Sequence, residues 1–186
     1  MAKSVWVMSK NNTKNENALV VLTIAAMFAM AAITATAILP SGQLYAQEED
    51  AQEFTTELSG EAEVPSIETE ASGDATFELN SAGDQMTYTI DVESIDRVLY
   101  AHIHQGSSDE NGDIVVTLFN PSSPTAEING ELANGTITSS NLEGPLQGKQ
   151  MSDLIGLINN GTAYVNVHTE ENPPGELRGT IEESES

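Results

Sequence analysis

The three histidines of this 186-residue chain are the residues whose type and spacing are best suited to chemistry. Two lie in the segment 98–105 (VLYAHIHQ) and the third lies in the segment 163–168 (AYVNVH). If each segment is a β-strand, alternate side chains share one face. The face that carries the histidines then holds, in chain order, Tyr100, His102, His104, Tyr164, Asn166 and His168. Three imidazoles on two paired strands are a ligand set suited to Zn2+ or Cu2+.

One interpretation of this face is a metal site in which His102, His104 and His168 bind a single Zn2+ or Cu2+ ion. Alternate residues on a strand are ~7 Å apart at Cα, which allows two imidazoles to reach one ion. Catalytic zinc commonly has three protein ligands and a water molecule. In this interpretation Asn166 and Glu176 accept hydrogen bonds that fix the tautomers of the rings.

The other interpretation is a structural polar network without a metal. Here the histidines form hydrogen bonds with Tyr100, Tyr164, Asn166 and backbone groups, and Arg178 pairs with Glu176 or with a neighbouring acid. Buried polar groups need such partners, and a network of this kind would hold the strands in register. On the sequence alone we prefer this interpretation, because it explains the polar face without any chemistry.

The elements that must position these residues are short β-strands. Runs with period-two alternation recur at intervals near ~10 residues between Gly, Pro and Asn turns, which predicts an all-β, antiparallel sandwich. The runs 75–79 and 86–92 predict a hairpin, whereas residues 125–137 predict two weak strands broken by the Asn-Gly pairs at 129–130 and 134–135. Apolar residues at helical spacing in 151–161 (MSDLIGLINNG) predict one short helix.

Composition excludes several classes of function. The chain has no cysteine, so disulfides, thiolate metal sites and a cysteine nucleophile are excluded. The first 46 residues hold one of the 29 acids and three of the six bases, which leaves 28 acids, 3 bases and a net charge of −25 in residues 47–186. Such a surface repels nucleic acid and anionic lipid. Neither a Gly-x-Ser-x-Gly nucleophile motif nor an EF-hand loop occurs.

The N-terminal part of the chain predicts export. Residues 18–39 carry no charge, and ~20 apolar residues suffice to cross a bilayer as a helix. Lysines precede this run and acids follow it, which predicts a cytoplasmic N-terminal region, 1–17. The run is either a signal peptide cleaved before Gln47 or an uncleaved transmembrane anchor. An acidic linker (40–53), one domain (54–182) and a tail (183–186) are expected to follow.

Several motifs in this domain resemble the CHRD family, which is named after chordin. They occur in the order LSGEAEVP, ASGDATFELN, AHIHQG and YVNVHTEENPPGELRGTI, and together they span roughly Phe54 to Glu182. The resemblance implies an immunoglobulin-like, all-β extracellular module. It implies no agreed biochemical activity. One departure is the pair of prolines at 173 and 174, where the family more often shows one.

The function expected from these observations is that of an exported, non-enzymatic binding or structural module at the cell surface. Its expected partner is a protein or another cell-surface component, with membrane contact only through residues 18–39 if these are retained. A metalloprotein with a three-histidine site is the alternative. Asn134 and Asn160 begin Asn-Gly-Thr glycosylation patterns, so an exported domain is expected to offer both on its surface.

Overall fold

The computed structural model describes residues 51–184. The expected cytoplasmic region (1–17), the membrane or signal segment (18–39) and most of the acidic linker (40–53) therefore lie outside the described residues. None of the helices formed by residues 51–184 is both long and apolar enough to cross a membrane.

Short strands make up about half of the described chain, together with one α-helix and two 3-10 turns. Their bounds are β1 Gln52–Ser59, β2 Ser72–Leu79, β3 Gln85–Ile95, β4 Val98–Gln105, β5 Asp113–Phe119, β6 Ile128–Thr138, η1 Ser139–Asn141, η2 Gly144–Leu146, α1 Met151–Asn159, β7 Ala163–Thr169, β8 Leu177–Thr180 and β9 Glu182–Glu183. The predicted all-β architecture with one short helix is confirmed.

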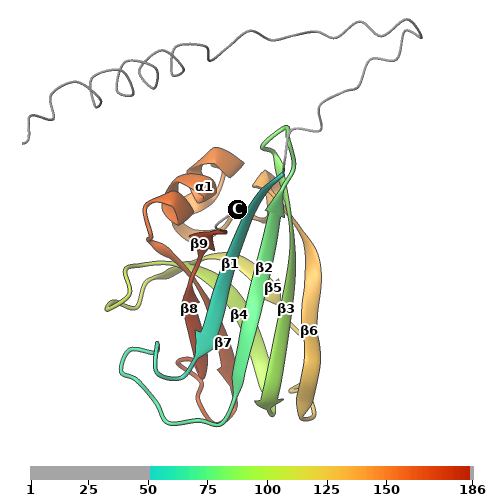
Figure 1. The fold of residues 1–186 in the computed structure, drawn as a ribbon, viewed down its shortest axis with the longest axis vertical. Helices are drawn as coiled ribbons and strands as arrows, with labels where there is room; N and C mark the ends of the chain where they lie inside the picture. The colour runs from blue at the N-terminus through green and yellow to red at the C-terminus, as the bar shows by residue number, and fades with distance from the viewer. Residues whose placement is uncertain (1–50, 185–186) are drawn as a thin grey trace, which may run out of the picture. The chain divides into compact units, whose positions relative to one another are not determined.

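The strands form one antiparallel sheet in the order β5-β4-β7-β8-β1-β2-β3-β6, and β9 pairs with β1 (Figure 1). The sheet curves back on itself until its edge strands β5 and β6 contact each other. The hydroxyl of Tyr88 on β3 donates to the carbonyl of Leu118 on β5 at 2.6 Å, which adds a side-chain link between the two ends of the sheet. The two layers of the expected sandwich are therefore parts of one nearly closed sheet.

The core lies between these layers and is filled by the inward face of each strand. On β4 and β7 the inward residues include Ala101, Ile103, Val165 and Val167, all fully buried. Burial of one such aliphatic side chain stabilises the fold by about 1.5–3 kcal/mol. The outward face of β7 is buried too, since all seven of its residues are buried. This second face carries the histidines, so something other than the core must cover it.

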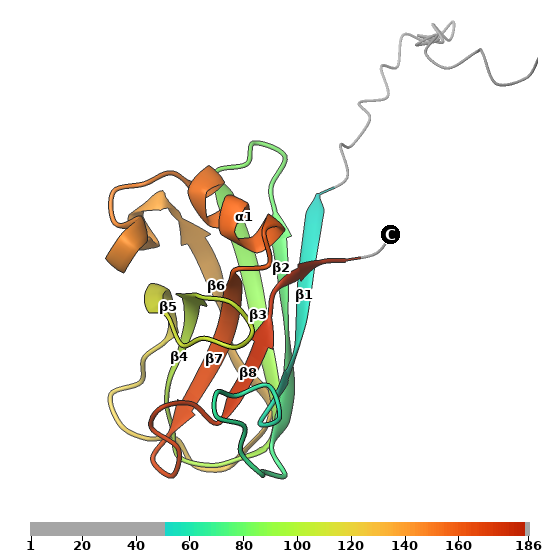
Figure 2. The ribbon, with the colours of Figure 1, turned by 90° about the vertical axis from the view of Figure 1, so that its left-hand side faces the viewer.

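Three loops cover the outward face of β7 and β8. They are the β1–β2 loop (60–71), the β4–β5 loop (106–112) and the β7–β8 loop (170–176). Figure 2 shows the first two in front of these strands. Arg178 on β8 bonds to the β4–β5 loop, and Asn166 on β7 bonds to Glu63 of the β1–β2 loop. A polar layer is thus enclosed between sheet and loops.

The hairpin and the helix are confirmed. β2 and β3 pair in register from Ser72↔Glu93 to Leu79↔Met86. Helix α1 buries Met151, Leu154 and Ile158, and it ends before Gly161, whose φ of +66° suits glycine.

The structure corrects three predicted boundaries. Residues 128–138 form one strand, not two, because pairing with β3 continues through both Asn-Gly pairs and a bulge absorbs the extra residue near Leu132. β1 begins at Gln52, inside the expected linker 40–53. Glu182–Glu183 pair with β1 as β9, so the tail expected at 183–186 begins one residue later.

Candidate metal centre

The pairing of β4 with β7 brings the three histidines together. In this register Tyr100 lies opposite His168, His102 opposite Asn166, and His104 opposite Tyr164. His168 therefore lies diagonally across the strand pair from His102, and diagonal neighbours of this size are within contact distance. The expected alternation of faces places all three rings on the outward side of the sheet.

The three rings form one cluster, which we call the histidine cluster. Ring centroids lie 5.6 Å apart for His102 and His104, 5.1 Å for His102 and His168, and 5.7 Å for His104 and His168. One nitrogen from each ring lies within 4.8 Å of the others. Nitrogens that share an ion at ~2.0–2.1 Å can be at most ~4.2 Å apart. Nitrogens as far apart as 4.8 Å would therefore have to close by at least about 0.6 Å to share an ion.

Backbone carbonyls fix the tautomers of two rings. His104 Nδ1 lies 2.9 Å from the carbonyl oxygen of Gly112, and His168 Nδ1 lies 3.0 Å from that of Pro173. A carbonyl oxygen only accepts hydrogen bonds, so each Nδ1 carries the proton and each Nε2 keeps its lone pair. Carbonyls thus take the role that was expected of Asn166 and Glu176.

Three nitrogens of the cluster lack a hydrogen-bond partner although they are buried: His102 Nδ1, His104 Nε2 and His168 Nε2. Each histidine is only 8% exposed. An unpaired buried polar atom costs roughly 1–3 kcal/mol, so folded proteins rarely keep one without a reason. Here the three unpaired nitrogens come one from each ring of the cluster.

Burial keeps the cluster uncharged at neutral pH. The pKa of His102 falls to about 4, first because of burial and then because of repulsion by His168 and His104. Burial also lowers the pKa of His104, partly offset by the Gly112 hydrogen bond, and that of His168, partly offset by the Pro173 hydrogen bond. Neutral imidazole is the form that binds metal, so these rings need not lose a proton first.

Arg178 is the central residue of the surrounding polar layer and is only 1% exposed. Its guanidinium donates to Asn111 Oδ1 at 2.9 Å and to the carbonyls of Ser107 at 2.7 Å and Glu110 at 3.0 Å. It also lies 3.6 Å from the centre of the Tyr164 ring. The expected pairing of Arg178 with Glu176 or a neighbouring acid is wrong, because the β4–β5 loop brings neutral oxygens to it.

Tyr164 connects Arg178 to the histidine cluster. Its ring stacks on His104 at a centroid distance of 5.1 Å and an interplanar angle of 10°, and its hydroxyl accepts from the Gly112 amide at 3.0 Å. Gly112 is the residue whose carbonyl orients His104. Tyr164 and Arg178 thus fix the β4–β5 loop, and this loop orients His104. The tyrosine rings stack on the histidines, in place of the expected hydrogen bonds from the tyrosine hydroxyls.

Glu63 is the member of this layer that sequence reasoning missed. Asn166 Nδ2 donates to Glu63 Oε1 and, at 2.9 Å, to the Leu177 carbonyl. Burial raises the pKa of Glu63, while Asn166 and Arg178 oppose that rise. Glu176 accepts from Thr69 at 2.7 Å and Thr169 at 2.6 Å. The sequence signal that could have identified Glu63 was its place in the motif LSGEAEVP, which lies well before either histidine strand.

Comparison with known protein families matches residues 54–181 to the CHRD domain. The chain belongs to the CHRD domain family. The match covers both histidine strands, Glu63 and Arg178, so the whole polar layer lies within the CHRD domain. A search among curated proteins found no match.

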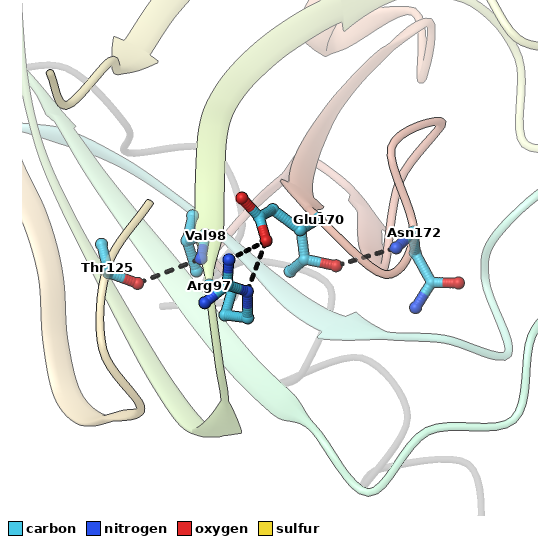
Figure 3. A network of polar contacts seen from close by, with 6 residues as sticks. Arg97, Val98, Thr125, Glu170 and Asn172 are labelled. Carbon is cyan, nitrogen blue, oxygen red and sulfur yellow. Dashed lines mark hydrogen bonds and ion pairs between the residues drawn. The ribbon is translucent and has the colours of Figure 1, made fainter. Parts of the chain in front are cut away.

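The β7–β8 loop of the CHRD domain, which carries Pro173, is fastened at its start. Figure 3 shows the ion pair between Arg97 and Glu170. The backbone amide of Asn172 donates to Thr169 Oγ1 at 3.0 Å. The hydroxyl of Thr169 in turn donates to Glu176. These contacts hold the loop in the position from which the Pro173 carbonyl reaches His168.

The two glycosylation candidates lie on the surface of the CHRD domain. Asn134 is exposed on β6, where its amide donates to Glu131 Oε1 at 2.6 Å, and Asn160 is exposed directly after α1. Neither belongs to the histidine cluster. Tyr100 stacks on His102 and is 43% exposed, so it lies at the border between cluster and solvent.

Proposed function

We propose that this CHRD domain is a metal-binding module that holds one Zn2+ or Cu2+ ion through His102, His104 and His168. The observation that carries this proposal is the set of three buried ring nitrogens, one on each histidine, that have no hydrogen-bond partner. An ion bound by all three would satisfy them together. The chain offers no thiolate, and imidazole nitrogens suit both zinc and copper.

A purely structural polar network explains these nitrogens less well. In such a network the neighbouring side chains would be the partners of the rings. Instead Asn166 bonds to Glu63 and to a backbone carbonyl, and the Tyr164 hydroxyl accepts from a backbone amide. The second nitrogens of His104 and His168 are already anchored on carbonyls, which is the support that metal-bound histidines usually have.

Metal uptake by the purified full-length protein tests the proposal. We expect about one Zn2+ or Cu2+ per chain by elemental analysis. The variant His104→Ala should lose affinity at least about 100-fold in calorimetric titration, because losing a ligand costs more than the 10–100-fold typical of outer-shell changes. Glu78→Gln, an exposed acid on β2, is the control for binding by surface carboxylates and should bind as the wild type does.

Equal metal uptake by the wild type and by the combined variant His102→Ala/His104→Ala would overturn the proposal. In that case the acidic surface, and not the histidine cluster, would be the binding site.

The module acts in binding or structure and not in catalysis. The sequence lacks a nucleophile motif, which supports this part of the proposal. The acids near the cluster are already hydrogen-bonded, since Glu63 accepts from Asn166 and Glu176 accepts from two threonines. The expected result is no metal-dependent hydrolase or redox turnover. Robust turnover that His104→Ala abolishes would contradict this part of the proposal.

Export to the cell surface is the third part of the proposal, supported by the uncharged run 18–39 and by the acidity of the residues after it. Fractionation of cells should recover the protein outside the cytoplasm. Sequencing the N-terminus of the recovered protein then distinguishes a signal peptide, which leaves Gln47 first, from a retained anchor. Recovery in the cytoplasm would contradict export.

A further inference from the structure

A pocket of about 390 Å3 lies on one side of the histidine cluster. Its walls are formed by residues of three strands and two loops: Tyr100, His102, Ile114, Asn120, His168 and Pro173. Two of the three histidines therefore border the pocket, as does the residue whose carbonyl orients His168. The half-exposed ring of Tyr100 stacks on His102 at a centroid distance of 5.7 Å, on the side nearest solvent.

The chain supplies three nitrogens to the cluster and no further strong ligand. Among residues 51–184 no carboxylate joins the three histidines. The pocket walls add only the Tyr100 hydroxyl and the Asn120 amide as polar groups outside the histidines. Zinc and copper bound by nitrogen ligands take at least four ligands as a rule, so a three-nitrogen site leaves a position to fill.

On the basis of the proposed function, we infer that the bound ion keeps one exchangeable coordination position that faces this pocket and takes a small donor from solvent. The fitting ligands are water, hydroxide and small singly charged anions such as azide. The walls are largely apolar, which favours compact ligands of low charge. The net charge of −23 disfavours anions of higher charge.

This inference separates two kinds of metal site. Structural zinc sites are closed by four protein ligands, whereas sites that exchange a ligand keep an open position. A hollow of about 530 Å3 also lies along the β4–β5 loop, but no histidine borders it. The pocket beside His102 and His168 is therefore the direction from which an external ligand reaches the ion.

The test uses the full-length protein loaded with Co2+, whose visible absorption responds to its ligands. Addition of azide should change the spectrum saturably, with one azide per bound cobalt. Asn120→Trp, an exposed position in the pocket wall, should weaken azide binding by about tenfold or more while cobalt uptake stays unchanged. Ile114→Phe fills the pocket from β5 and should act in the same direction.

Three outcomes would overturn the inference, and they are distinguishable. Stoichiometric cobalt with a spectrum that azide does not alter would show a closed site; it would leave the proposed metal binding intact. Absence of cobalt, zinc and copper uptake would overturn the proposed function and the inference together. An azide response equal in the wild type and both pocket variants would place the open position elsewhere and would also overturn it.

Discussion

At the scale of single residues, the three histidines are not equivalent. His104 and His168 are each anchored through Nδ1 to a carbonyl, so their Nε2 atoms keep a lone pair that can bind a metal. The unpaired buried atom of His102 is instead Nδ1, and its ring is stacked by Tyr100. In the proposed metal site, two of the three rings are thus oriented before binding, because they cannot turn without breaking a hydrogen bond.

Acid should destabilise the metal-free protein between pH 6.5 and about 4. The pKa of His102 is about 4 in the folded protein and about 6.5 in an unfolded chain, and those of His104 and His168 are also lowered. In this window the unfolded chain binds more protons than the folded protein does. The free energy of unfolding therefore falls as the pH falls.

Urea denaturation at several pH values checks this prediction. Other charged groups also contribute to the pH dependence of stability. Asp113 and Arg178 face His104 and act on its pKa. The pKa of Glu63 is raised, so its stabilising contribution is lost as the pH rises, which is opposite to the effect of the histidines. The measurement is therefore the difference between the wild type and His102→Phe, which should show the shallower fall. A midpoint difference that does not vary with pH would contradict the prediction.

At the scale of elements, the site depends on a loop held by a strand. Arg178 projects from β8 and donates to two carbonyls and one side chain of the β4–β5 loop, 106–112. That loop ends at Gly112, which orients His104. The position of one histidine on β4 is thereby set from a strand that is distant in sequence.

Arg178→Met should lower both stability and metal affinity. Loss of the charged hydrogen bonds should cost about 3 kcal/mol or more of unfolding free energy, since each is worth about 1.5–3 kcal/mol. Metal affinity should fall about 10–100-fold, as for other outer-shell changes. Arg97→Met is the matched control: that arginine forms an exposed ion pair, and its loss should cost less than about 1 kcal/mol. Similar losses in both variants would refute the role of Arg178.

Gly112→Ala should weaken metal binding through the same loop. A Cβ at this position would lie 1.6 Å from the carbonyl oxygen of Gln105, so the backbone must shift and carry the carbonyl away from His104. Gly156→Ala in α1 is the control, because the added Cβ would meet no atom within 4 Å beyond its own chain neighbours and the backbone of its helix. It should stabilise the protein by about 0.5–1 kcal/mol without changing metal affinity. Calorimetric titration and thermal unfolding measure both effects.

At the scale of the whole molecule, the polar layer around the histidine cluster joins parts of the sheet that are otherwise linked weakly. β8 and β1 share a single residue pair, Ser59↔Arg178, although they connect the two halves of the strand order. The polar layer reinforces this connection, since Asn166 on β7 bonds to Glu63 beyond the end of β1. The metal of the proposed site would bind to β4 and β7, which lie in one half of the strand order, and would add to the stability of that half.

Metal should therefore raise the melting temperature of the protein. At a free metal concentration of 100 times Kd, binding adds about 2.7 kcal/mol to the free energy of unfolding. For a domain of this size that corresponds to roughly 10 °C. Scanning calorimetry with and without Zn2+, and after addition of a chelator, measures the shift. An equal shift in His102→Ala/His104→Ala would assign the effect to the acidic surface.

The sequence by itself determined the elements and the faces. Period-two alternation decides which side of a strand is apolar, and this property is local, so the outward face of His102, His104 and His168 was predictable. The helix was predictable for the same reason, from Leu154 and its neighbours at helical spacing. The Asn-Gly pairs in β6 led to the wrong prediction of two separate strands, because strand pairing supplies hydrogen bonds that outweigh a local turn preference.

Only the tertiary structure decided what surrounds the histidines. The partners of Arg178 lie 67 to 71 residues away in sequence, and Glu63 lies 103 residues from Asn166. Loops that close over so long a separation leave no periodic signal, because their contacts depend on how the sheet curves. The same curvature brings backbone carbonyls, and not side chains, to His104 and His168, and it leaves one buried nitrogen of each histidine without a hydrogen-bond partner.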